Sequence, residues 1–161
     1  MTDRKKLGLY WTLFALWAGV IFYFSAQPDT VSSQQSGVFT QLLEEAVAFI
    51  SGPSANVGML YATLDHLVRK AAHFTVYLVL GVLAQRAYWH SGAKRRGLCV
   101  TLSLLTCALY AATDELHQYF VPGRAMMLTD VALDSAGALC GAAASVFVLD
   151  GKSRKGGRHK G

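Results

Sequence analysis

"LGLYWTLFALWAGVIFYF", residues Leu7 to Phe24, contains no charged side chain. About 20 apolar residues are needed for a helix to cross a bilayer, so this stretch predicts a membrane-spanning helix. Basic residues precede it, as in a secretory signal, but its apolar core is longer than that of a signal. The exit "FYFSAQP" also lacks the small-x-small pattern of a cleavage site. The sequence therefore predicts a signal anchor that is retained.

The composition extends this prediction to the whole chain. The 161 residues are 53% hydrophobic and 16% charged, with a mean hydropathy of +0.32. Soluble domains contain about 25% charged residues, so the shortfall points to a membrane protein. Three further apolar stretches, at Ala71–Trp89, Gly97–Ala112 and Val131–Leu149, approach the length of a span. We expect an all-α fold, a polytopic bundle of four transmembrane helices.

The segment from residue 25 to residue 70 joins the first two predicted spans. Within it, apolar residues such as Leu42, Leu43 and Ile50 fall on one helical face, with Glu44 and Glu45 on the other. This pattern predicts a short helix lying on the membrane surface. A second helical stretch, residues 57–68, is expected to continue into the second span. The chain is thus predicted to form one membrane domain, residues 1–150, and a basic cytoplasmic tail, residues 151–161.

Three cysteines lie inside the apolar stretches and show no CxxC spacing. Neither a zinc site nor a disulfide framework is therefore predicted. We interpret Cys99, Cys107 and Cys140 as small residues that pack inside the membrane.

The distribution of basic residues predicts the orientation. Of the 15 Lys and Arg residues, only Arg69, Lys70 and Arg124 fall on the side of the membrane opposite the termini. Basic loops stay in the cytoplasm, so both termini are predicted to be cytoplasmic. The basic tail "KSRKGGRHK", residues 152–160, is interpreted as a stop-transfer segment that contacts anionic lipid. Binding of nucleic acid by this tail is the less economical alternative, and no nucleic-acid partner is predicted.

Ionisable residues gather where the apolar stretches reach the exterior side. In "RKAAHFTVYLVLG", Arg69, His73 and Tyr77 share one helical face. The same side receives "TDELHQYFVPGRA", residues 113–125, which follows the third apolar stretch. Its candidate site residues are Asp114, Glu115, His117, Gln118 and Arg124.

The fourth apolar stretch contributes two carboxylates, Asp130 and Asp134, one helical turn apart. They are followed by Gly137 and Gly141, a GxxxG pattern that lets another helix approach closely or supports a homo-oligomer. A charge at the bilayer centre costs roughly 2.5–3.5 kcal/mol on insertion scales, so Asp134 needs a partner. Arg69 and Arg124 are the expected candidates.

Each of these residues also has a purely structural interpretation. Lys70 alone is expected to extend its amine to the membrane surface, and His117 alone to be an ordinary hydrogen-bonding residue. Tyr77 fits an aromatic belt. Taken together, the groups could form an ion-pair network that only holds the helices together.

These motifs, in this order, resemble the VanZ-like family of bacterial membrane proteins. The resemblance rests on "FSAQP", "RKAAHFTVYLVLG", "DELHQYFVPGR" and "DVALDSAGALCG". It implies a small multi-helix protein of the inner membrane with a link to glycopeptide antibiotic susceptibility. The polar motif positions of the family fall on Arg69, Lys70, His73, Tyr77, Asp114, Glu115, His117, Gln118, Pro122, Arg124 and Asp130. The family commonly has Asn where this chain has Asp134, which favours a hydrogen-bonding role there.

Three functions remain open at this point. The first is binding or remodelling of a membrane lipid, a lipid-linked envelope molecule or a lipoglycopeptide-type ligand. Arg69, Lys70 and Arg124 would hold its anionic group, and Tyr77, Gln118, Asp130 and Asp134 would complete the site. The second is a hydrolase or transferase acting on a lipid head group, with His73 or His117 as base and Asp114 or Glu115 as its orienting partner. The third is a small proton-coupled transporter. No cofactor is predicted, and no known metal-ligand spacing occurs.

Overall fold

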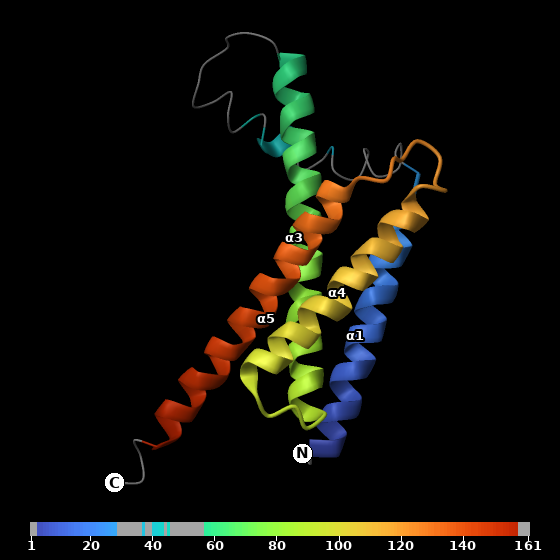
Figure 1. Cartoon of the computed structure of the whole chain (residues 1–161). Helices are drawn as coiled ribbons and strands as arrows, with labels where there is room; N and C mark the ends of the chain where they lie inside the picture. The colour runs from blue at the N-terminus through green and yellow to red at the C-terminus, as the bar shows by residue number, and fades with distance from the viewer. Residues whose placement is uncertain (1–2, 29–36, 38–39, 44, 46–56, 158–161) are drawn as a thin grey trace.

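The computed structural model describes residues 3–28, 37, 40–43, 45 and 57–157. These residues form helices and no strand, with four long helices: α1 (Asp3–Ser25), α3 (Val57–His90), α4 (Arg96–Gln118) and α5 (Leu128–Gly157). Each is long and apolar enough to cross a membrane. The predicted all-α bundle with four spans is confirmed (Figure 1).

The helix boundaries refine the sequence prediction in three places. α4 continues through the ionisable cluster to Gln118, so the third span is longer than its apolar run. The second helical stretch does join the second span in one helix, α3. α5 continues to Gly157, past the predicted boundary at residue 150. Residues 37, 40–43 and 45 are helical, and the rest of the predicted surface helix lies outside the described residues.

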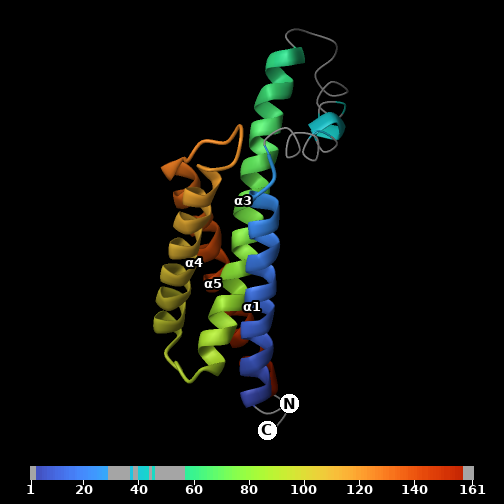
Figure 2. The same ribbon diagram turned by 90° about the vertical axis from the view of Figure 1, so that its right-hand side faces the viewer.

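Successive long helices run in opposite directions through the bundle (Figures 1 and 2). α1 and α4 end at the same end of the bundle at which α3 and α5 begin. We call this end, with the α4–α5 loop (residues 119–127), the polar end. With 34 residues α3 is about 51 Å long, against about 35 Å for the 23 residues of α4. The first turns of α3 therefore stand beyond the other helices at the polar end (Figure 1).

The outer surface of the bundle is apolar, as a lipid-facing surface requires. Leu16, Leu109 and Phe147 are among the exposed large hydrophobic side chains. The interior holds a small apolar core that includes Leu80 and Ala111. Of the cysteines, Cys99 and Cys107 are buried as predicted, whereas Cys140 is exposed.

Helices are tied together by polar side chains that find backbone or side-chain partners. The Trp17 indole donates to the Val76 carbonyl at 2.8 Å, and the Tyr110 hydroxyl donates to the Ala18 carbonyl at 2.6 Å. Deeper between α3 and α5, the buried Ser145 hydroxyl donates to Gln85 at 2.7 Å. In a bilayer such groups have no water to bond, so these contacts connect α1 to α3 and α4, and α3 to α5.

The closest helix pair is α3 with α5, and glycines make it possible. A Cβ atom added at Gly137 would overlap the Phe74 carbonyl, and one added at Gly141 would overlap the Leu78 carbonyl. Gly81 of α3 meets the α5 backbone in the same way. The predicted close approach of a helix to the GxxxG face is therefore confirmed, and the partner is α3 of the same chain. Since this face is buried, Gly137 and Gly141 cannot form the predicted homo-oligomer contact; self-association stays a prediction that needs another surface.

This packing predicts a stability difference between two glycines. Gly141→Ala should lower the melting temperature in detergent, because overpacking between backbones costs about 1–3 kcal/mol. Gly19→Ala, in α1, has nothing within 4 Å of the added Cβ and should melt like the parent or slightly higher. Equal melting of the two variants would show that α3 and α5 do not pack through these glycines.

Candidate functional site

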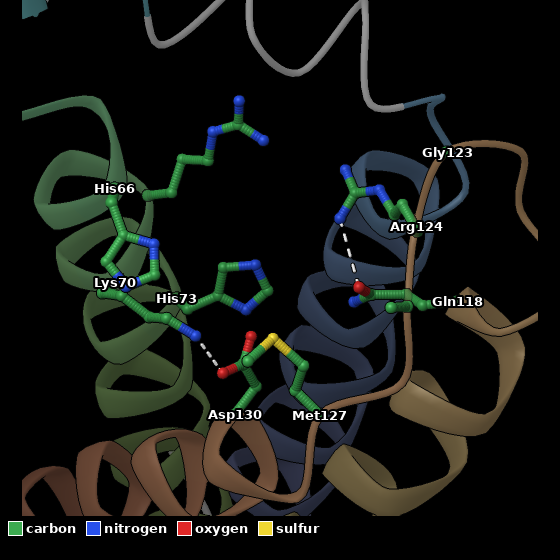
Figure 3. Close-up of a pocket in the computed structure, with 10 residues that line it drawn as sticks. His66, Lys70, His73, Gln118, Gly123, Arg124, Met127 and Asp130 are labelled. Carbon is green, nitrogen blue, oxygen red and sulfur yellow. Dashed lines mark hydrogen bonds and ion pairs between the residues drawn. The ribbon is translucent and has the colours of Figure 1, made fainter. Parts of the chain in front are cut away.

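A cavity of about 180 Å³ lies at the polar end (Figure 3). Its lining comes from one face of α3, the end of α4, the α4–α5 loop and the start of α5. The lining residues are His66, Arg69, Lys70, His73, Gln118, Gly123, Arg124, Ala125, Met127 and Asp130. Segments far apart in the sequence thus meet at one pocket, as the motif positions suggested.

α3 supplies four of the charged or titratable lining residues because of its periodicity. His66, Arg69, Lys70 and His73 follow one another at three- and four-residue steps on one face. His66 was missed by the sequence interpretation. The signal for it was present: His66 stands one heptad before His73, on the same side of the helix.

Lys70 is part of an inter-helical ion pair and does not merely extend to the surface. Its amine contacts the Asp130 carboxylate at the start of α5 (Figure 3). The side chains are 24% and 16% exposed, so the pair is partly shielded from solvent. The expectation for Lys70 alone was therefore wrong, because α5 brings an acidic partner to its end of α3.

Arg69 has a local partner on its own helix. Its guanidinium contacts Asp65, one turn earlier in α3, at 2.9 Å. Asp65 in turn is 3.4 Å from the Thr40 hydroxyl, in the segment between α1 and α3. The sequence predicts Arg69 as one possible partner of Asp134. In the structure Arg69 pairs with Asp65 instead of Asp134.

Asp134 is paired with a histidine. Its carboxylate lies 3.5 Å from Nδ1 of His73, and its side chain is 1% exposed against 26% for His73. The partner is neither Arg69 nor Arg124, because helix α5 turns Asp134 toward the histidine-bearing face of α3. The carboxylate nearest to His73 is thus that of Asp134, and the expected pairing of a histidine with Asp114 or Glu115 is not seen among the described residues.

Arg124 is held on a tight loop next to the pocket. Gly123 has φ +80°, a left-handed backbone conformation that glycine adopts without strain. The guanidinium donates to the Gln27 carbonyl at 3.0 Å and to Gln118 Oε1 at 3.2 Å. The Gln27 contact assigns a role to the "FSAQP" motif, since it joins the end of α1 to the loop.

Two buried carboxylates of α4 hold the wall of the pocket from behind. Asp114, 3% exposed, accepts a hydrogen bond from Gln118 at 3.3 Å, and Gln118 in turn accepts one from Arg124. Glu115, 1% exposed, accepts from the backbone N–H of Met127 at 2.9 Å. Neither carboxylate lines the cavity. Their role is to fix Gln118 and Met127, which do line it.

Two predicted site residues lie away from the cavity. The ring of His117 packs against Phe22 of α1, with centroids 4.6 Å apart, and does not line the pocket. This placement argues against a catalytic role for His117. Tyr77 is fully buried in the core near Tyr110, so it is neither an aromatic-belt residue nor part of the cavity lining.

The arrangement favours an anion in the cavity. Three cationic side chains and two histidines face a single carboxylate among the lining residues that the structure describes. No group of three or more metal-ligating side chains is found in the described part of the chain. The site can therefore hold a small negatively charged group by charge-assisted hydrogen bonds.

Comparison with known proteins supports the resemblance noted in the sequence. The model of the VanZ/LLP1 family matches residues 10–149, which include most of the first span, the other three spans and every lining residue of the pocket. No curated protein and no solved structure matches the chain. Because the family model covers most of its length, the chain belongs to the VanZ/LLP1 family of multi-pass membrane proteins.

Proposed function

We propose that the protein binds an anionic head group of a membrane lipid or lipid-linked envelope molecule in the cavity at the polar end. The observation that carries this proposal is the meeting of Arg69, Lys70 and Arg124 at one cavity. Phosphate and carboxylate groups are the anions that such side chains recognise. A cavity of about 180 Å³ is below the roughly 300–1,000 Å³ of pockets that enclose a whole drug-sized ligand, so only a head group would enter.

Apolar surface next to the cavity suits the rest of such a ligand. Phe120 in the α4–α5 loop and Leu128 at the start of α5 are 73% and 74% exposed, and Met127 both lines the cavity and is 45% exposed. Acyl chains would lie against these side chains while the head group occupies the cavity. A ligand that is only polar would leave this surface without a partner.

The orientation follows from the basic residues. We place the polar end on the exterior side of the inner membrane and both termini in the cytoplasm, by the positive-inside rule. The ligand then belongs to the outer leaflet or the cell envelope. A change in glycopeptide susceptibility, which the family resemblance implies, would follow from binding or remodelling a lipid-linked or lipoglycopeptide-type molecule there.

Cysteine labelling tests the orientation. In a background without Cys99, Cys107 and Cys140, the variant Pro122→Cys should react with a membrane-impermeant maleimide in intact cells. Lys94→Cys, exposed at the opposite end of the bundle, should react only after permeabilisation. The reverse pattern would place the cavity in the cytoplasm and remove the envelope ligand from the proposal.

Arg124 variants test the binding site. Arg124→Ala should weaken binding of dioctanoyl phosphatidic acid by about tenfold to a hundredfold, because a hydrogen bond to a charged group contributes about 1.5–3 kcal/mol. Arg124→Lys should recover little, since an amine cannot reproduce a two-pronged guanidinium contact. Native mass spectrometry in detergent measures the affinity, and inorganic phosphate serves as the head group without its lipid.

A matched control separates binding from folding. Arg95→Ala removes the same charge from an exposed position at the other end of the bundle and should leave lipid affinity unchanged. Arg124→Ala loses, among its contacts, the hydrogen bonds to the Gln27 carbonyl and to Gln118 Oε1, and the binding proposal expects its melting temperature to fall only modestly. If melting temperature and affinity collapse together in Arg124→Ala, the cluster is a scaffold and the binding proposal fails.

A further inference from the structure

His73 and Asp134 form a pair whose two members differ sharply in exposure. Asp134 is buried between α3 and α5, while His73 is partly open to the cavity. Figure 3 shows the imidazole between the Lys70–Asp130 pair on one side and the Gln118–Arg124 pair on the other. Since Nδ1 faces Asp134, Nε2 is the nitrogen left for a group in the cavity.

The geometry is that of a general base held by a carboxylate. A buried carboxylate next to Nδ1 fixes the imidazole tautomer that has Nε2 unprotonated, and it stabilises the imidazolium that forms after proton uptake. Anion binding alone does not require this partner. The two side chains are in ion-pair contact at 3.5 Å, and neither His73 Nδ1 nor either oxygen of Asp134 has a closer hydrogen-bond partner in the described part of the chain. Burying such a carboxylate is costly, so a role beyond packing is indicated.

The described lining of the cavity lacks a hydroxyl or thiol nucleophile, and its one carboxylate, that of Asp130, is engaged by the Lys70 amine. Among the lining residues that the structure describes there is no serine, threonine, cysteine or tyrosine. A reaction that forms an ester with such a side chain is therefore not supported by this cavity. Water, activated by His73, is the nucleophile that fits.

We propose that this cavity hydrolyses a phosphate ester bond in the head group of a membrane lipid, with His73 as the general base and Asp134 as a positioning residue. The proposal rests on the binding function argued above. His73 Nε2 removes a proton from water, and the oxygen of that water attacks phosphorus. The bond from phosphorus to the ester oxygen breaks, and its electron pair leaves with that oxygen.

The imidazolium of His73 then returns the proton to the leaving oxygen, so that no proton is gained or lost by the protein. Lys70 and Arg124 stand on either side of the imidazole, where they stabilise the charge that develops on the other phosphate oxygens. The products are an alcohol and a phosphate group that carries one oxygen from water. The reaction is redox-neutral and consumes one water molecule.

Isotope transfer is the direct test. The full-length protein is placed in nanodiscs of bacterial polar lipid extract supplemented with phosphatidic acid, in water enriched in ¹⁸O. Mass spectrometry should find ¹⁸O in the phosphate group of a product with the parent protein. His73→Gln should reduce this incorporation at least a hundredfold while keeping the melting temperature.

Asp134→Asn separates positioning from folding. It introduces the residue that the family commonly has at this position, so the fold should tolerate it and the melting temperature and KM should stay the same. The negative charge next to the imidazole is lost, so in this chain kcat should fall at least tenfold, and an unchanged kcat would show that Asp134 acts only as a hydrogen-bonding residue. Ser145→Ala is the matched control, because it removes a different buried polar contact between α3 and α5 and should leave kcat unchanged.

Two results would overturn the inference. One is incorporation of ¹⁸O by His73→Gln at the rate of the parent. The other is no incorporation above that of His73→Gln in the parent protein while phosphatidic acid still binds in an Arg124-dependent manner. The second result would leave the binding function intact, whereas loss of Arg124-dependent binding as well would remove both proposals.

Discussion

The contact between α3 and α5 is the constraint on which the site depends. These two helices run in the same direction, and their backbones approach closely because Gly81, Gly137 and Gly141 carry no side chain. The approach fixes both the spacing and the rotation of the two helices. Two side-chain pairs then connect the helices at the polar end: Lys70 with Asp130, and His73 with Asp134. A bulkier residue in place of one of these glycines would separate α3 from α5 and so pull both side-chain pairs apart, even though no residue of the cavity itself had been changed.

The other two helices complete the site from the outside of this pair. The end of α1 reaches the α4–α5 loop through the hydrogen bond from Arg124 to the Gln27 carbonyl. The end of α4 positions two lining residues of the cavity. Asp114 accepts a hydrogen bond from the Gln118 side chain, and Glu115 accepts one from the backbone N–H of Met127. Charged groups at membrane depth are thus used mainly to fix neighbouring groups. The side chains that face the cavity itself are mostly cationic or histidine.

The spans and most residues of the site could be predicted from the sequence, but the pairing of the charged and histidine side chains could not. A long uncharged apolar stretch such as Leu7 to Phe24 is stable as a helix in lipid, so the four spans could be predicted from the positions of such stretches. Helical spacing placed Arg69 and His73 on one face but carried no information about how α5 is rotated against α3. For that reason the partner of Asp134 was assigned to an arginine instead of His73. His117 was misjudged for the same reason, since the position of α1 beside it was unknown.

The exposed side chains of Phe120 and Leu128 have a consequence for how tightly the cavity must bind. A ligand whose tail rests in the same leaflet is confined to a thin layer around the protein, so its effective concentration at the cavity is far above its average in the cell. Each tenfold gain in concentration replaces about 1.4 kcal/mol of binding free energy. A small cavity with only a few polar contacts can therefore stay occupied while releasing its ligand quickly. Such a site can sample many lipid molecules without any lid.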